Sequence, residues 1–554
     1  MKNLLLFSLL IITGFTSKAQ NLYLKIEGNS TEETKIIDSI GYKSKHPDTK
    51  SIIDETKNFS SILTKNGYLE TEFKSQKKIN DSTFLFKYHI GKKTNLIHIY
   101  IGGIPSQEKK LLELSADTLK IKLSEVDNFM NRNLANLEQK GYSLSELQLV
   151  NHKKENNHLL AELKIKTENK RKLNNIVILG YPKFPEGIRR NIVKQFQKKT
   201  FNQENLKQLH SLFKALPFTN QTKYPEILFT KDNTKAYVYL EKTRSNRFEG
   251  FIGFSNDENS GTRFIGYLDL LLNNALNTGE KFNLYWKSDG KKQTSFNIGT
   301  ELPYIFKTPL GIKANLRIFK QDSIFQNTTT DLNLGYYFQY NSKVYLGYQS
   351  EESIDIQKSN TSLISGFKST FWTASYEFFN FNPENYLFKE KTNFFIKTGT
   401  GKRNSKLESN NQYFILLEAF HNFNLNKKNL IYIKNQSFFL QSPNYIANEL
   451  HRFGGINSIR GFSENSLQAS SFSGFMTEYR YLLTQNMYLH SITDYGYFQD
   501  KSSNFNNNLL GLGLGLGIAT KNGILNLIYA NGSSKGETIK LSNSIIHISF
   551  KTIF

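Results

Sequence analysis

One arginine lies in a glycine-rich segment that interrupts a long run of alternating β-strand patterns. The segment covers residues 451–462 and reads His-Arg-Phe-Gly-Gly-Ile-Asn-Ser-Ile-Arg-Gly-Phe. Gly454, Gly455 and Gly461 permit tight turns there, because glycine adopts positive φ without steric cost. The guanidinium of Arg460 offers five donors in a fixed fork, which suits a carboxylate. The segment therefore predicts an arginine that is held on a folded loop and faces an acidic partner.

Two downstream carboxylates are the candidate partners of this arginine. Glu478 and Asp494 both lie in alternating strand patterns. Because side chains alternate between the faces of a strand, Glu478 shares a face with Gly474 and Met476, and Asp494 with Gly496. If those faces line a barrel lumen, an ion pair there is screened less by water than a surface pair. We expect a loop fixed in a lumen by charge; an ordinary surface turn with hydrated carboxylates is the alternative.

The sequence contains no recognisable catalytic or metal-binding set. It has no cysteine, which excludes disulfides and thiolate metal sites. His451, His490 and His547 lack the spacing of metal ligands, and Gly-x-Ser-x-Gly is absent. Ser491, His490 and Asp494 do not form a plausible triad, since adjacent strand positions face opposite ways. We expect no enzymatic activity, no metal and no cofactor.

The N-terminus and the composition indicate an exported protein. Residues 1–19 combine Lys2, an apolar run from Leu4 to Phe15 and a small-residue cleavage site, which is typical of a signal peptide. No later stretch is apolar over the length that a transmembrane helix needs. The 44 Phe and 29 Tyr gather in the C-terminal half, while the mean hydropathy is −0.47. A membrane barrel fits both values, because only alternate residues of its strands face lipid.

The formal net charge of +23 raises the question of nucleic acid as a partner. The lysines are scattered and form no basic helix, and the export signal removes the chain from most nucleic acid. We therefore expect no nucleic-acid partner. Solvated faces, anionic headgroups and a basic channel account better for the charge.

The N-terminal part of the chain contains a repeated pattern. The hexapeptide Leu63–Tyr68 recurs at Leu137–Tyr142, and a degenerate copy follows at Leu212–Phe218, an offset of about 74 residues each time. Gly67 and Gly141 in these copies suit the C′ position of a helix. Each unit reads as a short strand, helical material and two closing strands. We expect the units at residues 20–94, 95–170 and 171–246.

Two local features of these units predict helix boundaries and faces. In the second unit, Ser124 occupies a position that suits a helix N-cap. In the third unit, Ile188, Ile192 and Phe196 recur at helical spacing and are expected to share a buried face. Repeated α+β units of this kind leave sheet edges that suit pairing with an extended client strand; spacers are the alternative.

Residues 247–554 read as a barrel of long alternating strands with polar turns. At roughly 19 residues for each strand and loop they accommodate about sixteen strands, an even number as a closed antiparallel barrel requires. From Leu510 to Ile518 leucines alternate with glycines, so the leucines should face lipid and the glycines the lumen. The last strand carries Phe550 and Phe554 on one apolar face. Closure should pair it with the first strand near residues 248–254, because lipid does not tolerate an open sheet edge.

These motifs together resemble one known superfamily. Gly454, Gly455, Ile459, Arg460, Gly461 and Phe462 match the Gly-Gly-x3-[Val/Ile]-Arg-Gly-[Phe/Tyr] loop of the superfamily of BamA, TamA and the two-partner-secretion transporters. In that superfamily the loop lies between the eleventh and twelfth strands and enters the lumen. Glu478 and Asp494 fall on strands similar to its Glu-containing and Asp-x-Gly strands. The terminal Phe554 resembles the insertion signal of outer-membrane barrels, and the repeats resemble POTRA domains.

The resemblance implies a transmembrane β-barrel of about sixteen antiparallel strands preceded by tandem α+β POTRA-like domains. It places the barrel in the cell outer membrane and the N-terminal domains in the periplasm. The implied function is the assembly and insertion of outer-membrane proteins or translocation through the pore, with two-partner-type export of a secreted polypeptide as the alternative. The implied partners are unfolded outer-membrane or secreted polypeptide clients, the lipid bilayer and periplasmic accessory proteins. A passive porin would leave the repeats unexplained.

Overall fold

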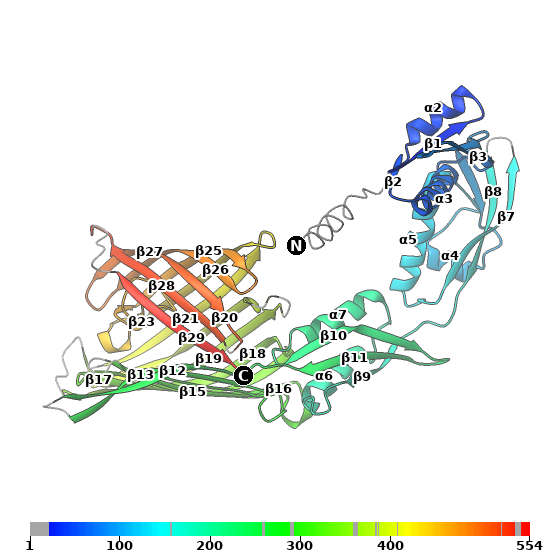
Figure 1. Cartoon of the computed structure of the whole chain (residues 1–554). Coiled ribbons are helices and arrows are strands. Elements are labelled where there is room, and N and C mark those ends of the chain that lie inside the picture. Colours follow the sequence, from blue (N-terminus) through cyan, green and yellow to red (C-terminus); the bar gives the residue numbers. More distant parts are fainter. Residues whose placement is uncertain are drawn as a thin grey trace, which may run out of the picture. The chain divides into compact units, whose positions relative to one another are not determined.

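The computed structural model is shown in Figure 1. It describes residues 21–155, 158–257, 261–288, 293–357, 364–382, 385, 387–406, 408–521, 523–537 and 544–554. The predicted signal peptide, residues 1–19, lies outside the described residues. The chain forms two compact units: Met1–Arg171 with Thr200–Gln203, and Lys172–Lys199 with Glu204–Phe554. No helix among the described residues is long and apolar enough to cross a membrane.

The first unit contains two α+β modules of the same design. The first module consists of β1 (Leu22–Gly28), α2 (Thr31–Ile40), β2 (Lys45–His46), α3 (Thr49–Lys65), β3 (Glu72–Asn80) and β4 (Thr83–His89). The second consists of β5 (Leu96–Tyr100), α4 (Ser106–Leu112), β6 (Thr118–Lys122), η1 (Leu123–Glu125), α5 (Val126–Gln139), β7 (Glu146–Glu155) and β8 (His158–Lys166). Their sheets have the equivalent orders β2-β1-β4-β3 and β6-β5-β8-β7. In each, the first strand runs parallel to the last, so the chain must cross over through helices.

The repeated hexapeptides end a helix in the same way in both modules. Gly67 has φ of 100°, its N–H donates to the Thr64 carbonyl over 3.0 Å, and the Tyr68 N–H donates to the Leu63 carbonyl over 3.0 Å. Gly141 has φ of 96° and is followed by the same pair of bonds. This is the Schellman arrangement, which satisfies the last carbonyls of the helix. The prediction that these glycines occupy C′ positions is confirmed.

The predicted N-cap at Ser124 is wrong. Ser124 lies inside the short helix η1, and α5 begins after it at Val126. Glu125 occupies the N-cap position, and its side chain makes no capping hydrogen bond. The helical turn of η1 leads directly into α5, and the Val126 N–H, which Ser124 would have capped, donates to the Leu123 carbonyl.

The third module belongs to the second unit and is joined to the barrel. It consists of β9 (Leu173–Leu179), α6 (Glu186–Phe196), α7 (Gln203–Lys214), β10 (Thr219–Phe229) and β11 (Thr234–Lys242), with sheet order β10-β11-β9. Ile188, Ile192 and Phe196 are buried on α6, as predicted. In a buried contact with the barrel, the Asn274 amide donates to the Tyr181 hydroxyl over 2.8 Å. The Gln195 amide donates to the Phe338 carbonyl over 2.7 Å, so hydrogen bonds to the barrel hold this module.

The C-terminal part closes into an antiparallel barrel whose described strands number sixteen, which confirms the predicted fold. In order around the barrel they are β12 (Arg247–Asp257), β13 (Gly261–Asn273), β14 (Lys281–Ser288), β15 (Gln293–Leu302), β16 (Leu310–Gln321), β17 (Phe325–Gln339), β18 (Ser342–Asp355), β19 (Phe367–Phe381), β20 (Glu390–Ser405), β21 (Ser409–Asn424), β22 (Asn429–Gln441), β25 (Ser471–Thr484), β26 (Met487–Asp500), β27 (Phe505–Ala519), β28 (Gly523–Ser534) and β29 (Ile545–Ile553).

The predicted alternation of β27 is confirmed. Leu514 is 68% exposed on the outer face, whereas the glycines lie on the inner face, where Gly515 and Gly517 face large side chains. A Cβ atom added at Gly515 would lie 2.1 Å from Nε2 of His490, and one at Gly517 would lie 2.1 Å from the Tyr488 ring. The glycines therefore leave the space that these two side chains of β26 occupy.

The barrel closes between its first and last strands, as expected, but with a different register. Within the described residues β12 and β29 pair at Arg247–Ile553 and Phe248–Thr552. Asn246 and Phe554 exchange two further backbone hydrogen bonds of 3.2 and 3.0 Å. The sequence analysis expected pairing over residues 248–254. Of these, Phe248 pairs with β29, and the other paired positions, Asn246 and Arg247, precede it. The reason is that β29 pairs with β28 over its length and meets β12 at its C-terminal end. We call this short junction the seam.

We predict that Gly67→Ala destabilises the first module more than Gly41→Ala does. Both glycines have positive φ, but a Cβ atom at Gly67 would lie 2.2 Å from the Thr94 carbonyl oxygen, whereas one at Gly41 would meet nothing within 4 Å. Positive φ should cost each variant on the order of 1–3 kcal/mol, and the clash should add about 1 kcal/mol or more at Gly67. Hydrogen exchange of β1 amides in the full chain measures the difference; equal protection in the two variants would contradict it.

Candidate functional site

The glycine-rich segment lies in a long connection between two barrel strands. Residues 442–470 link β22 to β25, which are the eleventh and twelfth strands in the barrel order. The connection contains η3 (Ala447–Glu449) and a small sheet of β23 (His451–Phe453) and β24 (Leu467–Ala469). We call residues 442–470 the lumen loop. Gly454, Gly455 and Gly461 have φ of 101°, 102° and 87°. Each therefore adopts the positive φ that the sequence analysis predicted.

Arg460 contacts both carboxylates that the sequence proposed as its partners. Its Nε and Nη2 donate to the two oxygens of Asp494 over 2.8 and 2.6 Å, and its backbone N–H donates to the same carboxylate over 2.9 Å. Nη1 donates to Oε1 of Glu478. The residues are 4% (Arg460), 7% (Glu478) and 0% (Asp494) exposed. The structure thus brings together three side chains from a loop and two strands, in a fork-to-carboxylate geometry that favours charge-assisted bonds.

A second arginine, which sequence reasoning missed, completes this charge network. Nε of Arg480 donates to Oε2 of Glu478 over 2.6 Å, so Glu478 bridges two guanidinium groups. Nη1 of Arg480 donates to Asn422 over 2.8 Å. The guanidinium lies 4.4 Å from the ring centroid of Phe388 and 4.3 Å from that of Tyr432, within cation–π range. Two arginines and two carboxylates balance in charge, which lowers the cost of burying them.

Apolar contacts also hold the segment against the inner wall. Ile459 is fully buried, and its Cδ1 occupies the space that side chains at Gly474 and Gly496 would fill, 2.9 and 3.2 Å from ideal Cβ positions. Phe453 stacks on Phe472 with a centroid distance of 3.9 Å. Gly461 approaches the backbone of β28, and Phe462 packs against Gly532 there. The predicted loop residues therefore make their contacts with β25, β26 and β28.

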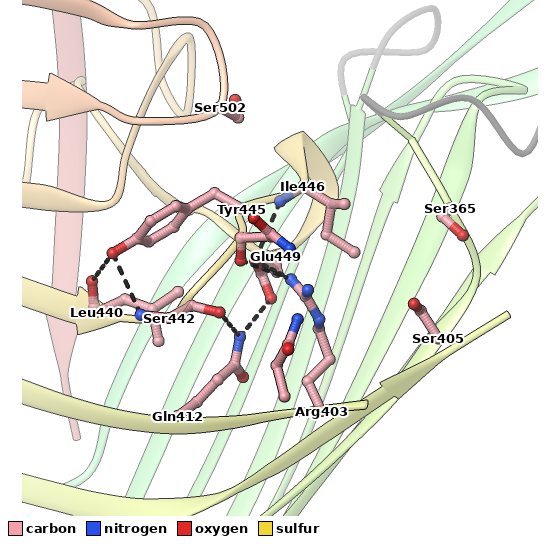
Figure 2. Close-up of polar contacts among 12 residues, drawn as sticks. Ser365, Arg403, Ser405, Gln412, Leu440, Ser442, Tyr445, Ile446, Glu449 and Ser502 are labelled. Atoms are coloured by element: carbon pink, nitrogen blue, oxygen red, sulfur yellow. Dashed lines mark hydrogen bonds and ion pairs between the residues drawn. The ribbon is translucent and has the colours of Figure 1, made fainter. Parts of the chain in front are cut away.

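The start of the lumen loop has its own buried attachment, which sequence reasoning also missed (Figure 2). Nη1 of Arg403 on β20 contacts Oε1 of Glu449 and donates to the Asn444 carbonyl over 3.2 Å. The Gln412 amide on β21 donates to the other oxygen of Glu449 over 2.8 Å. Glu449 also accepts the Ile446 backbone N–H over 3.0 Å. Arg403 is 2% exposed, so this contact is as deeply buried as that of Arg460.

The tip of the lumen loop reaches the strands on the far side of the seam. Glu464 forms an ion pair with Lys287 and accepts the Tyr285 hydroxyl over 3.3 Å, both on β14. The Asn465 carbonyl accepts the Gln293 amide of β15 over 3.4 Å. The loop is thus attached to several sectors of the barrel wall, among them β20–β21, β25–β28 and β14–β15.

The histidines and the serine that the sequence analysis considered for catalysis lie in separate surroundings. His451 stacks on Phe438, and His490 lies beside Glu478 with its Nδ1 atom 3.6 Å from the carboxylate, so the two histidines belong to different clusters. Ser491 accepts a bond from the Tyr479 N–H on the outer side of the wall, opposite His490. In the part of the chain that the structure describes, no group of three or more His, Cys, Asp and Glu residues could hold a metal ion.

The terminal aromatic residues lie where the last strand faces outward. Phe550 and Phe554 are 41% and 48% exposed, and Ile546 and Ile548 on the same face are 69% and 66% exposed. His547 and the other odd-numbered residues of β29 point to the opposite face. The apolar face of this strand is therefore available to lipid, and its role as an insertion signal remains a prediction.

Comparisons with known proteins identify the architecture. No protein-family model and no curated protein matches the chain. Among solved structures, CdiB from Acinetobacter baumannii gives a TM-score of 0.52 at 16% identity, over 83% of this chain and 90% of that one. CdiB from Escherichia coli gives 0.50 at 12% identity, over 94% and 98%. BamA from Haemophilus ducreyi lacking POTRA domains 1–3 gives 0.45 at 15% identity, over 82% and 99%. The CdiB matches establish the fold, and the expected outer-membrane localisation agrees with it.

We predict that Arg460→Ala frees the lumen loop while the barrel stays closed. Removal of the guanidinium strands two buried carboxylates, a change that commonly costs about 3–5 kcal/mol. Because the chain has no cysteine, a single Ser458→Cys, at a position that is 6% exposed, reports release of the loop through its rate of maleimide labelling. Labelling should accelerate at least tenfold in Arg460→Ala and less in Arg460→Lys, which keeps the charge. Equal rates with and without the arginine would rule out fixation by charge.

Proposed function

We propose that this chain, which has the fold of the POTRA-bearing outer-membrane barrel superfamily, inserts client β-barrel proteins into the outer membrane at its seam. The observation that carries the proposal is the short pairing between β12 and β29. Within the described residues these strands pair at two positions, whereas β12 pairs with β13 from Arg247–Leu271 to Asp257–Gly261. The seam is therefore the junction that separates at the lowest cost in hydrogen bonds.

The free part of β12 gives the client a template. Beyond Phe248, the backbone groups of β12 that face the seam have no partner on β29 among the described residues. Unpaired backbone groups are costly in lipid, so an incoming strand that pairs with them is stabilised. The client then gains further free energy as its apolar face enters the bilayer. The process needs no nucleotide and no enzymatic step.

The attachments of the lumen loop favour insertion over export. A polypeptide that passes through the lumen must displace a loop held by buried ion pairs at Arg460 and Arg403 and by a further ion pair at Glu464. Breaking a buried pair commonly costs about 3–5 kcal/mol. Insertion at the seam leaves these contacts in place. Export by the two-partner route, the alternative function, requires the loop to leave.

The N-terminal modules fit a role in the delivery of clients. We propose that residues 20–94, 95–170 and 171–246 act as three POTRA-like domains in the periplasm and that residues 247–554 form the barrel. The strands β3, β7 and β10 each lie at the end of a sheet, where an extended client can pair. The proposed partners are unfolded outer-membrane polypeptides, the lipid bilayer and periplasmic accessory proteins.

We predict that a disulfide across the seam stops client insertion. Phe248 and Thr552 are directly paired, so Phe248→Cys with Thr552→Cys should crosslink in the cysteine-free chain. Insertion of a purified client barrel into liposomes should fall at least tenfold under oxidising conditions and recover with reductant. The matched control pairs Leu346→Cys with Ala374→Cys, which are partners on β18 and β19 far from the seam. Full insertion by the oxidised seam variant would refute insertion at this junction.

We further predict that depletion of the protein in its cell lowers the levels of many other outer-membrane barrels. An insertase serves several clients, so its loss affects all of them together. Quantitative proteomics of outer-membrane fractions measures the effect. Loss of a single secreted polypeptide, with other barrels at normal levels, would support the two-partner exporter instead.

A further inference from the structure

The lumen loop spans the seam from one side to the other. The barrel order around the seam is β14-β13-β12 on one side and β29-β28-β27-β26-β25 on the other. Arg460 attaches the loop to β25 and β26, and Gly461 packs on the β28 backbone. Only four positions after Arg460 along the chain, Glu464 binds Lys287 and Tyr285 of β14. The loop therefore crosses behind the junction between β29 and β12.

The two ends of this crossing differ in burial. Arg460 and Asp494 have side chains that are 4% and 0% exposed, whereas those of Lys287 and Glu464 are 36% and 25% exposed. A partly exposed ion pair is weaker than a buried one, because water screens it and hydrates both groups once they separate. When β12 to β14 move away from β29, the contact at Glu464 breaks first, and the loop stays with β25 to β28.

The last strand adds a titratable side chain to this place. His547 lies on the inner face of β29, between the outward-facing Ile546 and Ile548. It interacts electrostatically with both Lys287 and Glu464. The ion pair is thus positioned behind the stretch of β29 that has no partner on β12 in the described residues.

We propose that Glu464, together with Lys287 and Tyr285, is a latch that holds the seam closed from inside the lumen. The latch rests on the proposed function, because it regulates the junction at which clients would enter. It makes Glu464 a positioning residue of the loop with a task distinct from that of Arg460. Arg460 fixes the loop to one wall, and Glu464 ties that wall to the other.

The test measures closure of the seam without any client. The reporter is the rate at which Phe248→Cys and Thr552→Cys form a disulfide in the full-length protein in liposomes, since these residues meet only when the seam is closed. Glu464→Gln and Lys287→Gln should each lower this rate by about threefold, the size expected for a partly exposed ion pair. The double exchange Glu464→Lys with Lys287→Glu should restore most of the rate.

Lys313→Gln is the matched control. Lys313 pairs with Glu377 between β16 and β19, and their side chains are 32% and 16% exposed, similar to those of the latch. This variant should form the disulfide at the rate of the parent protein. An unchanged rate in Glu464→Gln, or an equal decrease in Lys313→Gln, would overturn the latch.

Different experimental results would refute the latch and the proposed function. If Glu464→Gln loosens the seam but no variant inserts clients, the latch stands and insertion is refuted. If the parent protein inserts clients and Glu464→Gln leaves the crosslinking rate unchanged, insertion stands and the latch is refuted. Failure of the charge exchange to restore the rate would also count against a latch that depends on charge pairing.

Discussion

A guanidinium buried inside a barrel needs carboxylates within reach, and the arrangement of the lumen follows from this need. Nε and Nη2 of Arg460 donate to Asp494, and Nη1 donates to Glu478. Glu478 in turn accepts a hydrogen bond from Arg480. Each of these residues would be costly to bury without the next. The loop is therefore restricted to one conformation. The strands that carry Glu478 and Asp494 must place both carboxylates at the same level along the barrel axis.

The charge network also explains the small residues around it. Gly474 and Gly496 make room for Ile459. At Gly511 the Arg460 carbonyl oxygen lies 2.4 Å from the position that a Cβ atom of residue 511 would occupy. Side chains at these positions would move the loop away from the wall and lengthen the bonds to Asp494. Packing and charge thus impose the same position on Arg460. A loop fixed so firmly to one side can transmit the movement of that side across the lumen.

Patterns that repeat within a strand or a helix could be predicted from the sequence. Alternation placed Glu478 and Asp494 on inner faces, and the spacing of the hexapeptides located Gly67 and Gly141 at helix ends. Contacts between distant segments could not be predicted in this way. Arg403 and Glu449 are 46 residues apart, and Lys287 and Glu464 are 177 apart. Their pairing depends on strand register and on the path of the loop, which alternation does not determine.

Arg480 is an intermediate case, because strand alternation could have predicted its position but not all of its partners. It lies two positions from Glu478, so alternation puts both on the inner face, and a charge count at that face could have revealed it. The seam shows the opposite situation, because closure of a barrel is required by lipid but its register is not. The error at Ser124 has a similar origin: a short helical turn before α5 is a local choice that one serine does not decide.

The alternating glycines of β27 have a consequence for how this protein can change during evolution. Gly515 and Gly517 accommodate His490 and Tyr488 of the neighbouring strand at distances that exclude any larger residue while those side chains remain. A substitution at one of these glycines is therefore harmful alone and acceptable after its neighbour has become small. We expect such epistasis to preserve each glycine with its bulky neighbour in related sequences, and to replace the two together.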